Sequence, residues 1–405
     1  MNSSPPAIVF ESVRRADVQV LRVRVLGRAT KDFELAHANQ ALTRLRQRLP
    51  DLLEPFRIAV GKVDSELTPD QALAAALHLD RLAYGFLDEL LVGSTWRPGP
   101  FIDALAEHIW PAFQNGRAPI VELRATSSDP FASLLPLELF PFVEPSSPYD
   151  RRVGEPFGRR MSRYLGFRAL IIRSQGGTSG PIARNAMGLI PIYIIALTDT
   201  RFRGVRRQVS FFRSRVRDFS VETDWPDPKT VNPDIAPDDL ARALLARDGL
   251  LHFCCHFHAE RYGEEPYFDF GGLPGRAPIR VTLSELRGAL ANQQNSSGPS
   301  PAQKLVFINT CRSGAHYETS LVGFLQEKRF TEIVGSESRL PDPVAGEYAI
   351  RFYTALLRGK SKAAAILQAR RDLLERQRNP AGLLYTSYGD PELCLQTRSV
   401  HLEGS

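Results

Sequence analysis

Short runs of apolar residues recur from residue 119 onward, separated by stretches with helical spacing. Runs rich in Ile, Val, Leu and Phe that alternate with helices are typical of a mostly parallel sheet, because helices then hide both of its faces from water. The runs lie at residues 119–125, 167–173, 188–198, 250–256, 304–310 and 330–336. We therefore predict an α/β fold with a mostly parallel sheet and helices on both faces.

The N-terminal part has a different pattern. "VQVLRVRVL" (18–26) alternates apolar and polar residues, and we expect it to form a β-hairpin with "AIVFESV" (7–13). Helical spacing follows over 69–91, with Pro69 at its start. Further on, helices are predicted between the apolar runs at residues 236–247, 282–291, 319–329, 344–358 and 361–377.

Composition limits the class of protein. A chain of 405 residues with 43% hydrophobic content can bury a large core. No apolar run reaches the roughly 18 residues that span a bilayer, and the start lacks a secretory signal pattern, so we expect a cytoplasmic protein without a membrane partner. Four cysteines, two of them adjacent, do not make a disulfide framework, which fits a reducing compartment.

Arginines account for most of the net charge of +6 and are densest in "RFRGVRRQVSFFRSRVR" (201–217). This segment reads as an amphipathic helix with Val205, Val209, Phe212 and Val216 about one face. We expect a solvated helix that covers the sheet. Direct nucleic-acid binding is not expected, because no stacking aromatics or recognised module accompany the arginines.

The segment "HFCCHFHA" (252–259) contains three histidines and two cysteines. His256 closes one apolar run and Cys311 closes another, "KLVFINT", so both are expected at the carboxyl ends of neighbouring strands, where active sites of parallel sheets lie. Their separation is 311 − 256 = 55 residues, close to the roughly 50 between the caspase histidine and cysteine. A histidine beside a cysteine can generate the thiolate and later protonate a leaving amine. The amides of Phe257 and Cys311 are candidates for stabilising the oxyanion.

Strand alternation places His252, Cys254, His256 and His258 on one side of such a strand. Histidines at alternate positions can also share a zinc ion, so a metallohydrolase is a rival interpretation. Against this interpretation, the sequence has no second cluster of residues with the spacing of zinc ligands. We therefore expect His252 and Cys254 to be core residues, His258 to lie at the rim, and no metal or other cofactor to be required.

Several blocks in order make a family resemblance specific. "LLHFCCHFHA" followed by "FINTCRSG" resembles the two catalytic blocks of the CHAT-domain family, caspase-like cysteine proteases related to separase. The run from residue 330 through "FYTALLRGKSKAAAILQAR", the closing "YTSYGDPELCL" (385–395) and the upstream "LPLELF" (135–140) also resemble that family. The resemblance covers roughly residues 80 to 397 and implies a caspase-like fold.

By this resemblance His256 is the base and Cys311 the nucleophile of a cysteine endopeptidase. The sequence departs from the family at Phe257, where glycine is usual, and at "SRLPD" (338–342), where a tryptophan is missing. Basic-specific relatives have an acidic residue in this region, for which Asp342 is the candidate, followed by Glu337. The alternative for Asp342 is a loop carboxylate or a helix cap ahead of the predicted 344–358 helix. The resemblance also implies a protein substrate, a possible activating partner protein and a role in prokaryotic defence or cell death.

We divide the chain into an N-terminal hairpin and helical segment (1–80), a protease domain (80–397, with halves at 80–235 and 236–397) and a tail (398–405). An inactive caspase-like scaffold that binds partner proteins is the alternative function, favoured by Phe257 and the missing tryptophan.

Overall fold

The fold is known from a computed structural model, and the structure describes only part of the chain. The described residues are 8–15, 18–25, 31–36, 44, 52–60, 66–91, 97, 101–103, 106, 118–124, 136–141, 157–174, 181–197, 199, 201–225, 233–245, 249–258, 265–272, 277–297, 304–310, 321–328 and 330–396.

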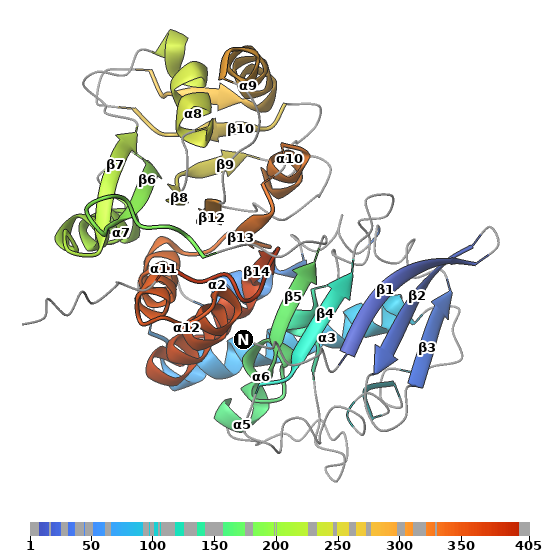
Figure 1. Cartoon of the computed structure of the whole chain (residues 1–405). Coiled ribbons are helices and arrows are strands. Elements are labelled where there is room, and N and C mark those ends of the chain that lie inside the picture. The colour runs from blue at the N-terminus through green and yellow to red at the C-terminus, as the bar shows by residue number, and fades with distance from the viewer. Residues whose placement is uncertain are drawn as a thin grey trace, which may run out of the picture.

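One large sheet runs through the molecule (Figure 1). Its strand order is β3-β2-β1-β4-β5-β14-β13-β12-β8-β6-β7. The strands are β1 (Ile8–Arg15), β2 (Val18–Val25), β3 (Lys31–Ala36), β4 (Ile120–Arg124), β5 (Leu170–Ser174), β6 (Ile190–Ala196), β7 (Phe219–Trp225), β8 (Gly249–Cys254), β12 (Lys304–Ile308), β13 (Glu332–Ser336) and β14 (Tyr385–Tyr388). Neighbouring strands are parallel except at the β3-β2, β2-β1 and β14-β13 pairs. The predicted mostly parallel sheet and the N-terminal hairpin are confirmed.

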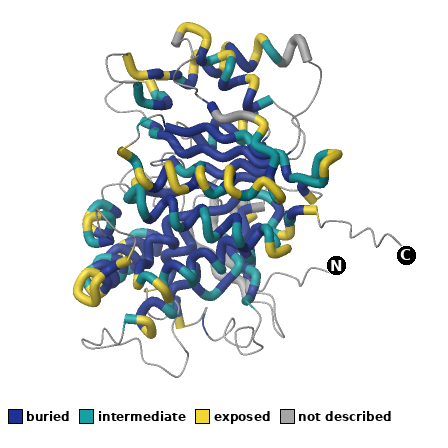
Figure 2. The backbone as a smooth tube through the Cα atoms, turned by 90° about the vertical axis from the view of Figure 1, so that its left-hand side faces the viewer, coloured by how far each residue is buried: buried dark blue, intermediate teal, exposed yellow. Residues whose placement is uncertain are grey.

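Helices cover both faces of the central strands (Figure 1). One face packs against α7 (Arg203–Ser214), α11 (Asp342–Leu357) and α12 (Lys362–Gln377). The other face packs against α8 (Ala236–Leu245), α9 (Leu283–Ser297) and α10 (Leu321–Glu327). Figure 2 shows the strands between these layers as continuously buried. Burial on both faces explains why these strands are apolar throughout rather than alternating.

Strand alternation sorts the residues of β8 between the two layers. Leu250 and Cys254 belong to the apolar cluster with α7, α11 and α12. Leu251 and Phe253 belong to the cluster with α8, α9 and α10. The alternation predicted for this run is therefore observed, although β8 ends at Cys254, two residues before His256.

The N-terminal strands have their own core. Phe10, Val121 and Ile171 pack with one side of α3 (Pro69–Leu90). Thr68 begins α3 with a capping box, in which its hydroxyl accepts from the Gln71 amide and the Gln71 side chain accepts from the Thr68 amide. The remaining short helices are α2 (Glu54–Ala59), α5 (Phe157–Met161), α6 (Leu165–Arg168), η2 (Leu137–Leu139), η3 (Pro233–Ile235) and η5 (Pro380–Leu384).

A second, three-stranded sheet lies above the carboxyl end of β8 in Figure 1. It consists of β9 (His256–His258), β10 (Tyr267–Asp269) and β11 (Arg280–Thr282), all antiparallel. The chain thus leaves the main sheet at Cys254, bends at Cys255 and enters β9 with His256. Among the helices that the structure describes, none is both long enough and apolar enough to cross a bilayer.

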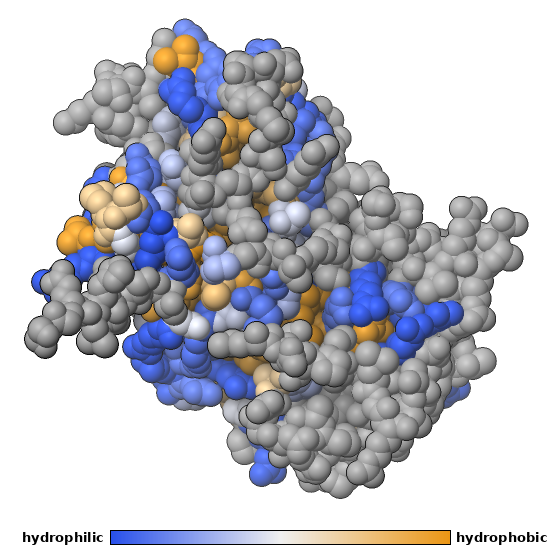
Figure 3. Space-filling model, viewed as in Figure 1, coloured by the Kyte–Doolittle hydropathy of each residue, from blue (hydrophilic) through white to orange (hydrophobic). Residues whose placement is uncertain are grey.

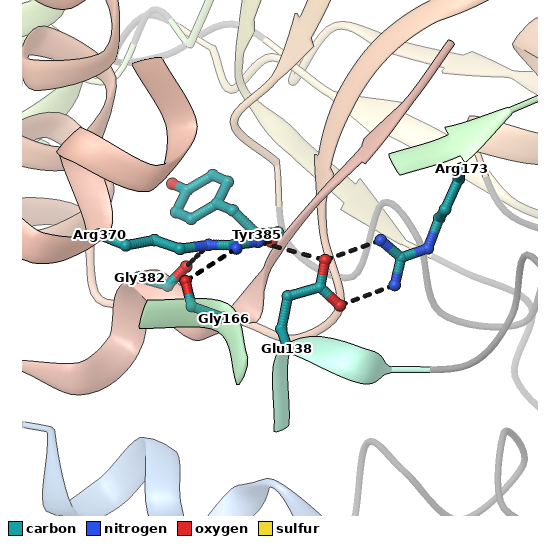
Figure 4. A network of polar contacts seen from close by, with 6 residues as sticks. All are labelled: Glu138, Gly166, Arg173, Arg370, Gly382 and Tyr385. Atoms are coloured by element: carbon teal, nitrogen blue, oxygen red, sulfur yellow. Dashed lines mark hydrogen bonds and ion pairs between the residues drawn. The ribbon is translucent and has the colours of Figure 1, made fainter. Parts of the chain in front are cut away.

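A buried ionic network joins the N-terminal and C-terminal halves of the sheet (Figure 4). The Glu138 carboxylate in η2 accepts two hydrogen bonds of 2.7 Å from Arg173 of β5, and one of 3.2 Å from Arg370 of α12. Arg370 also donates to the backbone carbonyls of Gly166, Gly382 and Tyr385. Burial would raise the pKa of Glu138, but the charges and hydrogen bonds of the two arginines outweigh it and lower that pKa.

Candidate active site

The site begins where two parallel strands end side by side. In the β8–β12 pair, Phe253 is opposite Ile308, and the Asn309 amide continues the ladder by donating to the Phe253 carbonyl at 2.8 Å. The carboxyl ends of both strands therefore lie at the same edge of the sheet. This is the position predicted for the groups at the ends of the two apolar runs.

The Asn309 side chain is held by three elements. Its amide group donates to the Gln208 side-chain oxygen of α7 at 2.6 Å and to the Ala345 carbonyl of α11 at 2.9 Å. Its oxygen accepts from the Tyr385 hydroxyl of β14 at 2.5 Å. Together with the backbone hydrogen bond to β8, these contacts hold Asn309 in one position between α7, α11, β14 and β8. Sequence reasoning did not select Asn309, because its partners come together only in the packed structure.

The next residue is held as well. Thr310 is buried, and its carbonyl accepts a hydrogen bond of 2.8 Å from the Ser336 hydroxyl at the end of β13. Cys311, the predicted nucleophile and oxyanion residue, lies outside the described residues. The structure therefore describes the two residues that precede Cys311 and the contacts that hold them.

His256 is the first residue of β9 and is partly exposed. The Phe202 ring, just before α7, packs edge-on against the imidazole with 5.0 Å between ring centroids. Asp269 of β10 is directly opposite His256 in the strand register. His256 is thus packed on one side by an aromatic ring and has a carboxylate as its cross-strand neighbour.

Partial burial lowers the pKa of His256 below its ordinary value of 6.5. The negative charges of Asp269, Asp342 and Asp199 oppose this shift, whereas the positive charge of Arg339 adds to it. A lowered pKa keeps the imidazole neutral at pH 7. Neutral imidazole is the form that can accept a proton from a thiol.

His252 and Cys254 are core residues, as predicted. His252 is fully buried, with one ring nitrogen 3.1 Å from the Tyr353 hydroxyl and the other 2.9 Å from the Gln208 side-chain oxygen. Burial lowers the pKa of His252 to about 3, so it stays neutral. Burial raises the pKa of the Cys254 thiol. Both ring nitrogens of His252 are already engaged, so this residue does not offer a ligand for zinc.

His258 lies at the other end of β9 and is partly exposed. Its ring stacks on Tyr267 with 4.6 Å between centroids, and its own pKa is lowered by burial. The Phe257 side chain points to the opposite side, where it is buried against Phe268. The alternation expected for 256–258 thus holds within β9. In the described part of the chain, no three His, Cys, Asp or Glu side chains converge as a metal site requires.

Asp342 lies at the start of α11 and contacts a second helix. Its carboxylate accepts from the backbone amides of Gly204 at 2.5 Å and Val205 at 3.0 Å, and so caps the N-terminus of α7. The two helix ends approach so closely that a Cβ on Gly204 would overlap the Asp342 backbone. The expected cap ahead of the 344–358 helix is wrong in its helix: Asp342 is the first residue of α11, and its carboxylate caps α7 instead.

Glu337 follows β13 and is buried, at 1% exposure. Its amide donates to the Leu384 carbonyl at 2.8 Å. The charge of Glu337 contributes to raising the pKa of Arg173, which relates this carboxylate to the ionic network of Figure 4.

Comparisons with known proteins agree with the resemblance seen in the sequence. The family model described as CHAT domain matches residues 211–393. A probable protease of Vitiosangium sp. (strain GDMCC 1.1324) is 28% identical over 183 residues, which cover 42% of this chain and 22% of the relative. The matched part thus spans about a fifth of that protein's length.

Among solved structures, two separase–securin complexes of Saccharomyces cerevisiae are similar to this chain. The structure at 3.0 Å resolution matches with a TM-score of 0.45 and 10% identity, over 95% of this chain and 30% of the other. The structure at 2.6 Å matches with a TM-score of 0.38 and 14% identity, over 88% of this chain and 23% of the other.

Proposed function

We propose that this chain, whose residues 211–393 match the CHAT-domain family model, is a cysteine endopeptidase with His256 as base and Cys311 as nucleophile. The observation that carries the proposal is the pairing of β8 with β12. His256 follows Phe253 by 256 − 253 = 3 residues, and Cys311 follows Ile308 by 311 − 308 = 3 residues, while Phe253 and Ile308 are opposite each other in the register. The chain bends at Cys255 before it reaches His256, so the register itself does not extend to the two residues; that both follow the same edge of the main sheet within a few residues of a paired position supports a meeting of their side chains.

The chemistry follows from these two groups. His256 takes the Cys311 proton, and the thiolate attacks the carbonyl carbon of the scissile bond. The amides of Phe257 and Cys311 donate to the oxyanion that forms. His256 then protonates the leaving amine, which leaves a thioester on Cys311. Water gives a proton to His256 as it attacks the thioester, and the acid product and the free thiol are released.

The hydrogen bonds of Asn309 and Thr310 support the same assignment. A nucleophile must be held within a fraction of an ångström of its productive position, and this needs neighbours with fixed conformations. Asn309 and Thr310, the two residues before Cys311, are tied to α7, α11, β13 and β14. We therefore propose that Asn309 is a positioning residue, which holds the segment that leads from β12 to Cys311.

Asp342 and Glu337 are the proposed acidic residues for a basic side chain before the cut. Asp342 is favoured, because its charge contributes to the pKa of His256, whereas Glu337 is buried. Its two bonds to α7 make it a fixed negative charge. An Asp342→Asn variant keeps one capping oxygen and loses the charge, so it should lose preference for arginine or lysine substrates, while one α7 amide left without an acceptor costs about 1–3 kcal/mol of stability.

The biological setting belongs to the proposal as well. We propose a regulated effector in prokaryotic defence or cell death that acts in the cytoplasm on a particular protein substrate. An activating partner protein would release its activity. These expectations are supported by the family resemblance.

Cleavage assays test the proposal directly. The purified chain is incubated with the protein products of neighbouring genes and with fluorogenic peptides that carry arginine or lysine before the reporter. We expect cleavage that is lost in Cys311→Ala and kept in Cys394→Ala, a matched control that removes a partly exposed thiol elsewhere. Cleavage that survives Cys311→Ala would refute the assignment. Binding of a partner protein without any cleavage would favour the inactive scaffold.

A further inference from the structure

The outer side of α7 carries a line of arginines. Arg203, Arg206 and Arg213 are exposed at helical spacing, with exposed Ser210 between them, whereas Gly204, Val205, Gln208 and Phe212 are buried on the opposite side. We call Arg203, Arg206 and Arg213 the arginine stripe. Figure 2, which views this side of the molecule, shows exposed residues along the outer surface of the helix that crosses in front of the buried strands.

Nearby carboxylates are already engaged with other arginines. Asp199 pairs with Arg201 at 2.6 Å, and Glu347 pairs with Arg207 at 2.8 Å. The helix itself contains no Asp or Glu. Arg203 and Arg206 form no ion pair with any residue that the structure describes. The positive charges of Arg203 and Arg206 are therefore not neutralised by ion pairs within the part of the chain that the structure describes.

Helix stability does not account for Arg203 and Arg206. Arg203 is the first residue of α7 and Arg206 lies in its first turn, where the helix dipole disfavours cations. Asp342, supplied by α11, caps this end. The positive end of the helix dipole, which disfavours Arg203 and Arg206, would stabilise a negatively charged ligand bound at this end of α7.

The stripe begins beside the candidate active site. Phe202, which immediately precedes Arg203, packs on the ring of His256. The helix is about 18 Å long, so the stripe leads away from His256 over the length of roughly five extended residues. At its far end Val216 is 70% exposed, and Met187 is 73% exposed in a neighbouring turn. Figure 3 shows hydrophobic and hydrophilic atoms side by side at this edge of the molecule.

We propose that the arginine stripe of α7 is an exosite for an acidic segment of the protein substrate, which it holds while the scissile bond lies at His256. The proposal rests on the peptidase function proposed above. Arginine forms paired hydrogen bonds with carboxylates, which suits aspartate- or glutamate-rich chains. Nucleic acid is disfavoured, because among the residues that the structure describes the exposed large hydrophobic side chains include no aromatic ring on which bases could stack.

Direct binding tests this exosite without requiring catalysis. The full chain carrying Cys311→Ala is titrated against a fluorescein-labelled peptide of alternating glutamate and serine, with anisotropy as the readout. We expect binding that weakens as salt is added. Changing the stripe to glutamine (Arg203→Gln, Arg206→Gln and Arg213→Gln together) should weaken it about tenfold.

A matched control makes the same charge change elsewhere. Arg159, Arg358 and Arg376 are exposed, and their joint change to glutamine should leave peptide affinity within about twofold of the parent. Equal affinity of the stripe variant and this control would overturn the proposal. Tighter binding of a single-stranded oligonucleotide that the peptide cannot displace would also overturn it, in favour of nucleic acid. If the peptidase assignment fails instead, peptide binding persists while no substrate is cleaved.

Discussion

Replacing Glu138 with glutamine should destabilise the fold strongly. Glu138 is 1% exposed and is the carboxylate shared by Arg173 and Arg370, which are 0% and 2% exposed. Glutamine has nearly the same shape but carries no charge, and its amide group would face the guanidinium donors. The substitution therefore removes the negative charge that hydrogen-bonds to both buried cations.

The size of the effect follows from this burial. Removing one partner of a buried, hydrogen-bonded ion pair costs about 3–5 kcal/mol, because the remaining charge stays desolvated. Glu138 accepts three charge-assisted hydrogen bonds and serves two cations, so we expect the upper part of this range. The loss should loosen the junction between η2, β5 and α12, through which the N-terminal strands are attached.

Urea unfolding of the full chain, followed by far-ultraviolet circular dichroism and by fluorescence, measures the change. The matched control is Glu327→Gln, which removes a carboxylate that is 51% exposed and paired with Arg287 at 3.1 Å. That exposed pair should contribute at most about 1 kcal/mol. Equal unfolding midpoints for Glu138→Gln and Glu327→Gln would refute the reasoning that the buried network stabilises the fold.

Three further predictions follow from the site and the network. Asn309→Ala should reduce kcat/KM by at least about tenfold while costing about 1–3 kcal/mol of stability, which enzyme assays and urea unfolding check together. The acidic limb of the pH–rate profile should have its midpoint below 6.5, since the pKa of His256 is lowered, and Asp269→Asn should move it lower still by removing a negative charge. The pKa of Glu138 is also lowered, so its contribution to stability is present above pH 4.5 and is lost as the pH falls below that value; the loss of urea resistance on acidification should be smaller in Glu138→Gln.

The central sheet could be predicted from the sequence because its strands are buried on both faces. Each of the six apolar runs overlaps a strand of the main sheet, and the predicted helices after residue 236 are present with ends shifted by up to six residues. Edge and outlying strands were missed. β7 (Phe219–Trp225) contains Ser, Thr, Glu and Asp, and β9 to β11 have only three residues each, too few for a period to be visible.

The basic segment shows where periodicity misleads. Val205 and Phe212 are buried as predicted, but α7 ends at Ser214, so Val216 lies beyond the helix and is exposed. Charged core residues were also missed. Arg173 and Arg370 are buried, although arginine is normally exposed, because both pair with the buried carboxylate of Glu138. Their burial could not be predicted, since Glu138 lies far from both arginines in the sequence.

The candidate site was predicted only in part, for a related reason. His256 could be selected because it ends a visible apolar run. Asn309 depends on Gln208, Ala345 and Tyr385, which no local pattern connects to it. Contacts of this kind arise from packing between elements, and a single sequence does not display them.

The rate at which Cys311 reacts with iodoacetamide, measured by mass spectrometry across pH, tests the proposed dyad most directly because no substrate is needed. If His256 stabilises the thiolate, the rate in the unmodified chain should reach half its plateau well below pH 8.5, the ordinary thiol value, and His256→Ala should shift that midpoint up toward about 8.5. Identical profiles for the two proteins would contradict the account.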